Sequence, residues 1–147
     1  MFFIFEDRAV IILLPNDLLE GAVKFHGHLG PFLILGLRAG LIGTDYLGKD
    51  YFVLKATVET SPSPPRSCFI DGIQFSSGCT VGKGNIEIKA SNDVSVEFVR
   101  GNRKISLMIR DAILDALAKM STEKQADTAS RDVLQKTDEE LFLIKRG

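Results

Sequence analysis

The chain has 147 residues, of which 45% are apolar and 25% are charged, a size and composition typical of one globular domain. Its 18 basic and 19 acidic residues give a formal net charge of −1, which disfavours binding to nucleic acid or to an anionic membrane. Two cysteines do not suggest a secreted disulfide scaffold, so a cytoplasmic location is expected. The most apolar run, residues 31–43, contains Arg38 and is shorter than the roughly 20 residues that cross a bilayer, so we expect no membrane span.

The first elements in chain order are predicted to be strands followed by a helix. Residues 1–14, MFFIFEDRAVIILL, are interrupted by charges at positions 6–8 and lack the cleavage pattern of a secretory signal, so we interpret them as one or two strands. Asn16 then provides a helix cap, and apolar residues at helical spacing predict a helix that ends near Phe25.

The segment 31–47 is apolar on almost every side, which predicts a buried helix. Its glycines at positions 36, 40 and 43 lie three and four residues apart and favour close approach of another backbone. The helix also carries more apolar surface than one small sheet obviously covers. We therefore expect a homodimer packed across it, with burial in the chain's own core as a nearly equal alternative; the residues concerned are Leu35, Leu37, Leu41 and Ile42.

The rest of the chain combines strands and helices and predicts an α+β fold. No repeat or long linker divides residues 1–147, so we expect a single domain in which amino-terminal helices are followed by a mainly antiparallel sheet with helices packed on it. The predicted strands are 51–59, 85–90, 94–99, 104–109 and 141–144, and the predicted later helices are 68–76, 110–120 and a polar helix after residue 127.

The two histidines of the chain, His26 and His28, flank Gly27 in the motif FHGHLGP at residues 25–31. Such residues can simply cap a helix or lie on the surface. Here Gly27, Gly30 and the proline after it restrict the backbone, so the turn itself sets the positions of the imidazoles. Imidazoles held in this way are suitable metal ligands, or general bases near neutral pH.

Both cysteines occur in a second motif, SCFIDGIQFSSGCTVGKGN, at residues 67–85. Ser67 is expected to cap a short helix with Cys68 in its first turn, where the helix terminus and nearby Arg66 would favour the thiolate. Cys79 lies in a glycine-rich turn that could bring it towards Cys68. For either cysteine alone, burial in the core is at least as reasonable, because free cysteine is among the most buried residue types.

The glycine-rich turn GCTVGKGN could bind an anion. It is not a nucleotide-binding P-loop, because the spacing of its glycines differs and no serine or threonine follows the lysine. Its backbone amides and Lys83 could still hold a smaller anion, such as a carboxylate or phosphate. The alternative is a tight turn that leads into the strand at residue 86.

The two motifs, in this order, resemble the amino-terminal domain of the E subunit of formylmethanofuran dehydrogenase and its stand-alone relatives. The likeness lies in H-G-H, C-x-x-D-G-I-Q and G-C-T-x-G-K-G-N; it covers residues 18–88 and extends more loosely to residue 120 and to the EELFLIK ending. It implies an α+β domain, usually dimeric, with a metal near the histidines and cysteines. Gly30 stands where many relatives carry a cysteine. The zinc ribbon of many relatives is not found in residues 1–147, so we expect a stand-alone form.

The resemblance also implies which residues form the site. Carried over residue by residue, the candidate metal ligands are His26, His28, Cys68 and Cys79, with Asp71 beside them. A mixed nitrogen and sulfur set favours zinc, with nickel or iron as alternatives. One histidine could instead act as a base, and Asp71 could orient it through a ring N–H. The candidate catalytic residues are therefore His26, Asp71 and Lys83.

Three functions stay open at this level. The first is a metal-binding accessory domain in the one-carbon metabolism of methanogenesis, where carbon dioxide becomes formylmethanofuran on a molybdenum or tungsten formylmethanofuran dehydrogenase complex. The second is an independent small metal- or thiol-dependent enzyme that acts on an anionic substrate. The third is a metal sensor or trafficking protein. Two cysteines are too few for iron–sulfur clusters, so the chain is not expected to reduce carbon dioxide alone.

Overall fold

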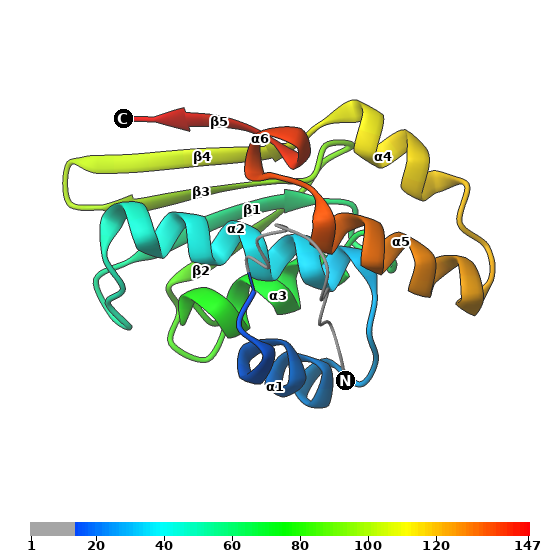
Figure 1. The fold of residues 1–147 in the computed structure, drawn as a ribbon. Helices are drawn as coiled ribbons and strands as arrows, with labels where there is room; N and C mark the ends of the chain where they lie inside the picture. Colours follow the sequence, from blue (N-terminus) through cyan, green and yellow to red (C-terminus); the bar gives the residue numbers. More distant parts are fainter. Residues whose placement is uncertain (1–13) are drawn as a thin grey trace.

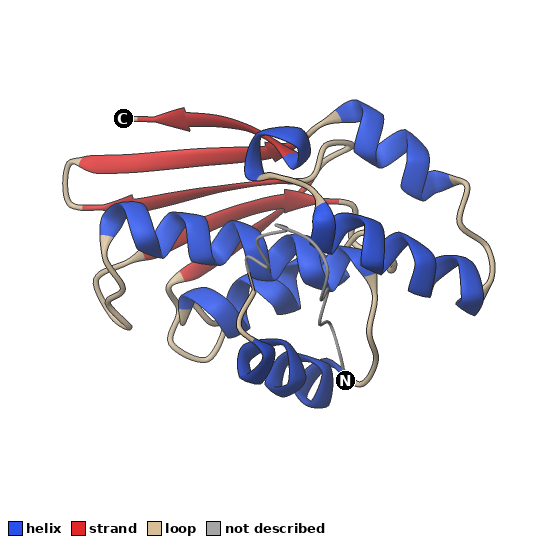
Figure 2. Cartoon of the chain, in the orientation of Figure 1, coloured by secondary structure: helices blue, strands red, loops and turns tan. Residues whose placement is uncertain are grey.

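The computed structural model describes residues 14–147, so the strands predicted before Leu14 lie outside the described residues. Helices gather against one face of a five-stranded sheet (Figure 1). Figure 2 shows that helices precede the first strand and also return after the fourth. The helices are α1 (Asn16–His26), α2 (Pro31–Leu47), α3 (Cys68–Ser77), α4 (Asp111–Ala118), α5 (Glu123–Gln135) and α6 (Asp138–Leu141), and the strands are β1 (Lys55–Thr60), β2 (Ile86–Ala90), β3 (Ser95–Arg100), β4 (Arg103–Ile109) and β5 (Phe142–Arg146).

The sheet has the strand order β2-β1-β3-β4-β5. Strands β1 and β2 run parallel, and the other neighbouring pairs are antiparallel, so Val58 is aligned with Ile88 on one side and with Val96 on the other. Alternate residues of β1 are buried, which is the pattern of a strand with one face against a core. The sheet is mainly antiparallel, which confirms the predicted α+β class.

Two predicted elements differ instructively in their boundaries. The helix over 31–47 is observed with the predicted bounds. The strand predicted from residue 51 begins only at Lys55, because residues 51–53 form a turn. The carboxylate of Asp50 accepts hydrogen bonds from the amides of Phe52 (3.0 Å) and Val53 (2.8 Å) and stabilises that turn.

Helix α2 forms the centre of the helical layer and packs most extensively against α3. Gly36 and Gly72 allow these helices to touch backbone to backbone, since a Cβ atom added to Gly72 would lie 2.7 Å from the Gly36 Cα atom. Most of α2 is buried within the one chain, so core burial accounts for its apolar surface, and the predicted homodimer cannot rest on this helix. Within residues 14–147, no helix is long and apolar enough to cross a membrane.

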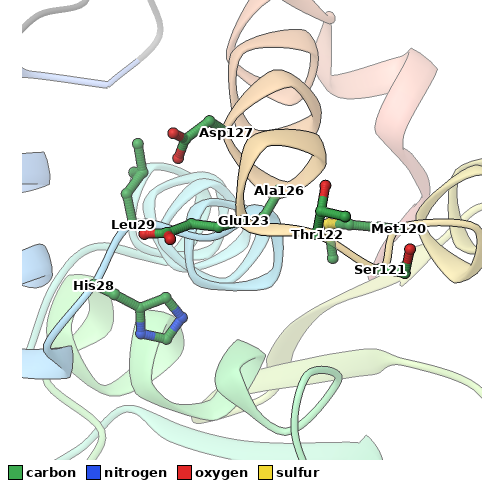
Figure 3. Close-up of a pocket in the computed structure, with 8 residues that line it drawn as sticks. All are labelled: His28, Leu29, Met120, Ser121, Thr122, Glu123, Ala126 and Asp127. Carbon is green, nitrogen blue, oxygen red and sulfur yellow. The ribbon is translucent and has the colours of Figure 1, made fainter.

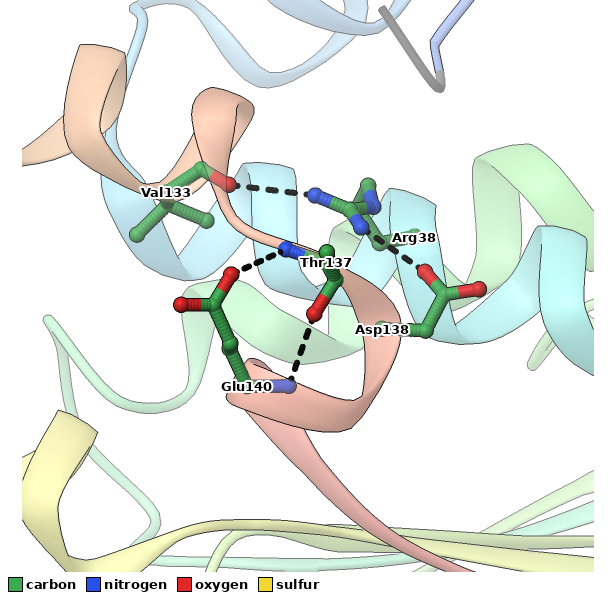
Figure 4. Close-up of polar contacts among 5 residues, drawn as sticks. All are labelled: Arg38, Val133, Thr137, Asp138 and Glu140. Atoms are coloured by element: carbon green, nitrogen blue, oxygen red, sulfur yellow. Dashed lines mark hydrogen bonds and ion pairs between the residues drawn. The ribbon is translucent and has the colours of Figure 1, made fainter. Parts of the chain in front are cut away.

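A buried arginine connects α2 to the carboxyl-terminal helices (Figure 4). The Arg38 guanidinium donates hydrogen bonds to the Val133 carbonyl (3.1 Å) and to the Asp138 carboxylate (2.7 Å). The short helix that contains Asp138 begins with a capping box, in which Thr137 and Glu140 bond each other's backbone amides. This polar cluster therefore attaches α5 and α6 to the centre of the fold.

Candidate functional site

The two histidines lie where α1 ends and the chain turns into α2. Gly27 adopts a left-handed conformation with φ 107°, and its amide donates to the Val23 carbonyl, which closes the helix. Pro31 then opens α2 as a first-turn proline. The turn brings the rings of His26 and His28 together, with 4.6 Å between their centroids.

His26 is held by a carboxylate from α3. Its Nδ1 atom lies 2.6 Å from Asp71 Oδ2, as expected for an orienting aspartate. A carboxylate can only accept, so Nδ1 carries the proton and the lone pair of the neutral ring is on Nε2. This Nε2 atom is buried and has no hydrogen-bond partner among the described residues. Such an atom is available to bind a metal ion or to accept a proton.

Cys68 lies in the first turn of α3, three residues before Asp71, and with His28 it lines a cavity of about 180 Å³. Burial, followed by the negative charge of Asp71, raises the pKa of the Cys68 thiol. The predicted thiolate stabilisation is therefore wrong. The Arg66 guanidinium donates instead to the Asn92 carbonyl (2.7 Å), and Ser67 makes no side-chain cap.

The structure separates Cys79 from Cys68. The two residues lie at opposite ends of the ten-residue helix α3, which is about 15 Å long at 1.5 Å per residue. Cys79 is fully buried, its thiol donates to the Leu54 carbonyl at a distance of 3.4 Å, and burial raises its pKa. Cys79 is therefore a core residue here, and the fold does not bring it together with Cys68.

The turn that contains Lys83 follows the same far end of α3. The amide of Thr80 donates to Asn85 Oδ1, and that of Val81 donates to Gln74 Oε1, both at 2.9 Å. The Lys83 ammonium itself donates to the Thr80 hydroxyl (3.1 Å). These groups already have partners within the chain, so this turn differs from the open amide cradle that anion binding requires.

Four residues from the carboxyl-terminal half were not identified from the sequence. Met120, Glu123, Ala126 and Asp127 line a cavity of about 370 Å³ opposite His28 (Figure 3). Glu123 and Asp127 are one turn apart on α5, a pattern that in sequence resembles an ordinary solvated helix face. Only the packing of α5 beside the histidine turn could have identified them.

The donors nearest the histidine turn are two imidazoles, the Cys68 thiol and the Asp71 carboxylate. Across residues 14–147, no group of three or more histidine, cysteine, aspartate or glutamate side chains is positioned to hold a metal ion. The arrangement contains an oriented histidine with a free nitrogen rather than a complete coordination sphere.

Comparison with known proteins identifies the family. A model described as FmdE, molybdenum formylmethanofuran dehydrogenase operon, matches residues 25–143. A probable S-adenosyl-L-methionine-binding protein of Archaeoglobus fulgidus is 34% identical over 71 residues, which are 47% of this chain and only 19% of that protein. An FmdE-like protein of tungsten formylmethanofuran dehydrogenase type from Syntrophus aciditrophicus shares the fold, with a TM-score of 0.64 and 16% identity over 95% of this chain and 76% of the other. On these grounds the chain belongs to the FmdE family.

Proposed function

We propose that this FmdE-family domain binds a transition metal ion, most favourably zinc, at the histidine turn. The ligands are His26 through Nε2, His28 and the Cys68 thiol, and Asp71 orients His26 from behind. The observation that supports this proposal is the buried Nε2 atom of His26, which has no partner while Nδ1 is fixed by Asp71. A carboxylate on the far nitrogen of a ligating histidine is a common feature of metal sites.

The donor chemistry fits zinc, since imidazole nitrogen and cysteine sulfur are its usual ligands. Because no three donors are grouped around one point in residues 14–147, binding requires the exposed His28 side chain to turn towards His26 Nε2. Cys68 must lose its proton on binding, which makes metal affinity rise with pH. A bound ion would supply Lewis acidity, and with three protein ligands it would keep a position open for a further molecule.

We further propose that the domain is an accessory component of one-carbon metabolism. The family description refers to a formylmethanofuran dehydrogenase operon, and this favours a molybdenum or tungsten dehydrogenase complex as the partner. A homodimer is the alternative assembly. Co-purification with the other components of the dehydrogenase tests the first, and sedimentation equilibrium of the isolated chain tests the second.

The metal proposal is tested by elemental analysis of anaerobically purified protein. We expect about one zinc ion per chain and its loss in His26→Ala, His28→Ala and Cys68→Ser variants that keep a native circular dichroism spectrum. Cys79→Ala is the matched control, because Cys79 lies at the other end of α3 and should retain the metal. A folded protein that neither contains zinc nor takes it up on addition would contradict the proposal.

A second candidate function is acid–base catalysis by the same pair. An Asp71-oriented His26 with a free Nε2 has the arrangement of a general base. A thiol-dependent enzyme is less well supported, because the raised pKa of Cys68 keeps its sulfur protonated. Turnover by the metal-free protein that disappears in His26→Ala would favour catalysis, whereas reversible zinc exchange without any turnover would favour metal sensing or trafficking.

A further inference from the structure

Two cavities meet at His28, on the side of the histidine turn that faces α5 (Figure 3). The inner one, of about 180 Å³, is lined by Cys68, and the outer one, of about 370 Å³, is lined by the first turns of α5. His28, Leu29, Met120 and Ala126 line both, so the two cavities are adjacent. Together they form a path from the surface to the proposed site.

The inner cavity is suited to an apolar group. Apart from His28 and Cys68, its walls are apolar side chains and one glycine, and include Phe32, Pro65 and Met120. Burial keeps the Cys68 sulfur in the neutral thiol form by raising its pKa. A dry apolar cavity of about 150 Å³ can hold a benzene ring, so a space of this size accommodates one ring or a short alkyl chain.

The outer cavity offers negative charge to whatever enters it. Glu123 and Asp127 contribute their carboxylates to its wall, and no basic side chain of residues 14–147 forms an ion pair with either of them. The start of α5 does not compensate with free amides, because Thr122 and Gln125 form a capping box that uses the amides of Thr122 and Gln125 themselves. The wall therefore favours a cation over an anion.

We propose that the His28 cavities bind a small molecule with an apolar end beside Cys68 and a positively charged end, such as a primary ammonium group, beside Glu123 and Asp127. This inference rests on the proposed function, because it takes the cavities as the approach to the His26 site. It also reverses the expected sign of the substrate charge, which the sequence assigned as negative from the turn containing Lys83.

The test compares two probes that differ in the sign of their charge. The full chain, with histidines labelled with ¹³C, is titrated with 2-phenylethylamine and, separately, with 3-phenylpropanoate, and the ring signals of His28 are followed by NMR. We expect the amine to shift the His28 signals saturably and to bind about tenfold more tightly than the carboxylate, since two unpaired carboxylates face the cavity. Absence of amine binding, or equal binding of the two probes, would overturn the proposal.

Charge-removing variants locate the effect. Glu123→Gln and Asp127→Asn should each weaken amine binding by about threefold to fivefold, the usual scale of an exposed ion pair, and should leave binding of the carboxylate unweakened. Asp115→Asn is the matched control, because Asp115 is exposed on α4 and lines neither cavity. Equal amine affinity in all three variants would also overturn the proposal.

The zinc content of each sample separates the two proposals. Amine selectivity that depends on Glu123 and Asp127 in a chain unable to bind zinc would contradict the metal site and support the cation-binding cavity. Zinc binding that depends on His26, without amine selectivity, would contradict only the cation-binding cavity.

Discussion

Two pairs of a basic side chain and a carboxylate connect helices of this domain, and they differ in how many bonds they leave open. The Arg38 side chain is 1% exposed, and its guanidinium bonds both Asp138 and the Val133 carbonyl. The His26 side chain is 9% exposed, and only one of its two ring nitrogens has a partner. The first pair is complete within the chain, and the second leaves one buried atom for something else.

This difference teaches how a structural polar cluster can be distinguished from a functional one. Burial of a polar group costs free energy unless its bonds are made, so groups that only support the fold are normally satisfied. Arg38 follows that rule and connects distant parts of the chain. His26 departs from it at a single atom, and that departure is the basis for assigning a site to the histidine turn.

The largest expected effect breaks the complete pair. Asp138→Ala leaves the buried Arg38 guanidinium without its carboxylate, which should lower the free energy of unfolding by about 3 kcal/mol. Urea unfolding at neutral pH measures this loss. Glu139→Ala, at an exposed neighbouring carboxylate, is the control and should change stability by less than about 0.5 kcal/mol. An Asp138→Ala protein as stable as the parent would show that the pair does not support the fold.

The second effect breaks the incomplete pair. Asp71→Asn should reduce zinc affinity by roughly 10- to 100-fold, because it removes the charged acceptor that fixes the His26 ring. Stability should change little, since an amide oxygen can still accept from Nδ1. Competition with a fluorescent zinc chelator gives the affinity, and Asp45→Asn, at an exposed site on α2, gives the baseline. Equal affinities in the two variants would remove Asp71 from the site.

The third prediction adds a donor to the incomplete pair. A Cβ atom built on Gly30 lies 3.4 Å from His28 Nε2, and the backbone there is extended, with φ −154° and ψ 157°. Gly30→Cys therefore places a thiol beside His28 without backbone strain and should raise zinc affinity, by about tenfold if the added ligand contributes about 1.4 kcal/mol. Gly30→Ser controls for side-chain volume. A cysteine variant that binds zinc no better than the serine variant would argue against His28 as a ligand.

The smallest effect is a pH dependence at Cys68. Burial, and then the charge of Asp71, raise the pKa of this thiol above the ordinary cysteine value of about 8.5. The folded state thus holds the proton to higher pH than the unfolded state. This contribution to stability is present below the unfolded pKa and is lost as pH rises through the folded pKa.

Alkylation rates measured against pH report that shift directly. In Cys79→Ala, which leaves Cys68 as the only cysteine, iodoacetamide should react with an apparent pKa above the ordinary value. Adding Asp71→Asn should lower that apparent pKa, because one of its two raising causes is removed. An apparent pKa that does not respond to Asp71→Asn would indicate that the carboxylate does not act on the thiol.

Most elements of the fold could be predicted from local sequence. Apolar periodicity gave the helix over 31–47, and the β-branched and aromatic residues gave the strands, whereas the turn at residues 51–53 was missed because the Asp50 side chain overrides their β propensity. The partner of Arg38 could not be predicted, since Asp138 lies 100 positions away and no periodic pattern links them.

The site divides in the same way. The proximity of His26, His28, Cys68 and Asp71 was anticipated from two short motifs. Their relation to Cys79 was not, because a turn of glycines allows many directions and the observed one places this thiol in the core. The wall formed by Glu123 and Asp127 depends on the docking of α5, which local patterns do not encode.

The central claim is that the free nitrogen of His26 binds a metal ion, and NMR of the imidazole nitrogens tests it most directly. In the ¹⁵N-labelled chain titrated with zinc, we predict that the Nε2 signal of His26 moves to the range of a metal-bound nitrogen while Nδ1 stays protonated and bonded to Asp71. A His26 spectrum unchanged at saturating zinc, in a protein that remains folded, would contradict the account.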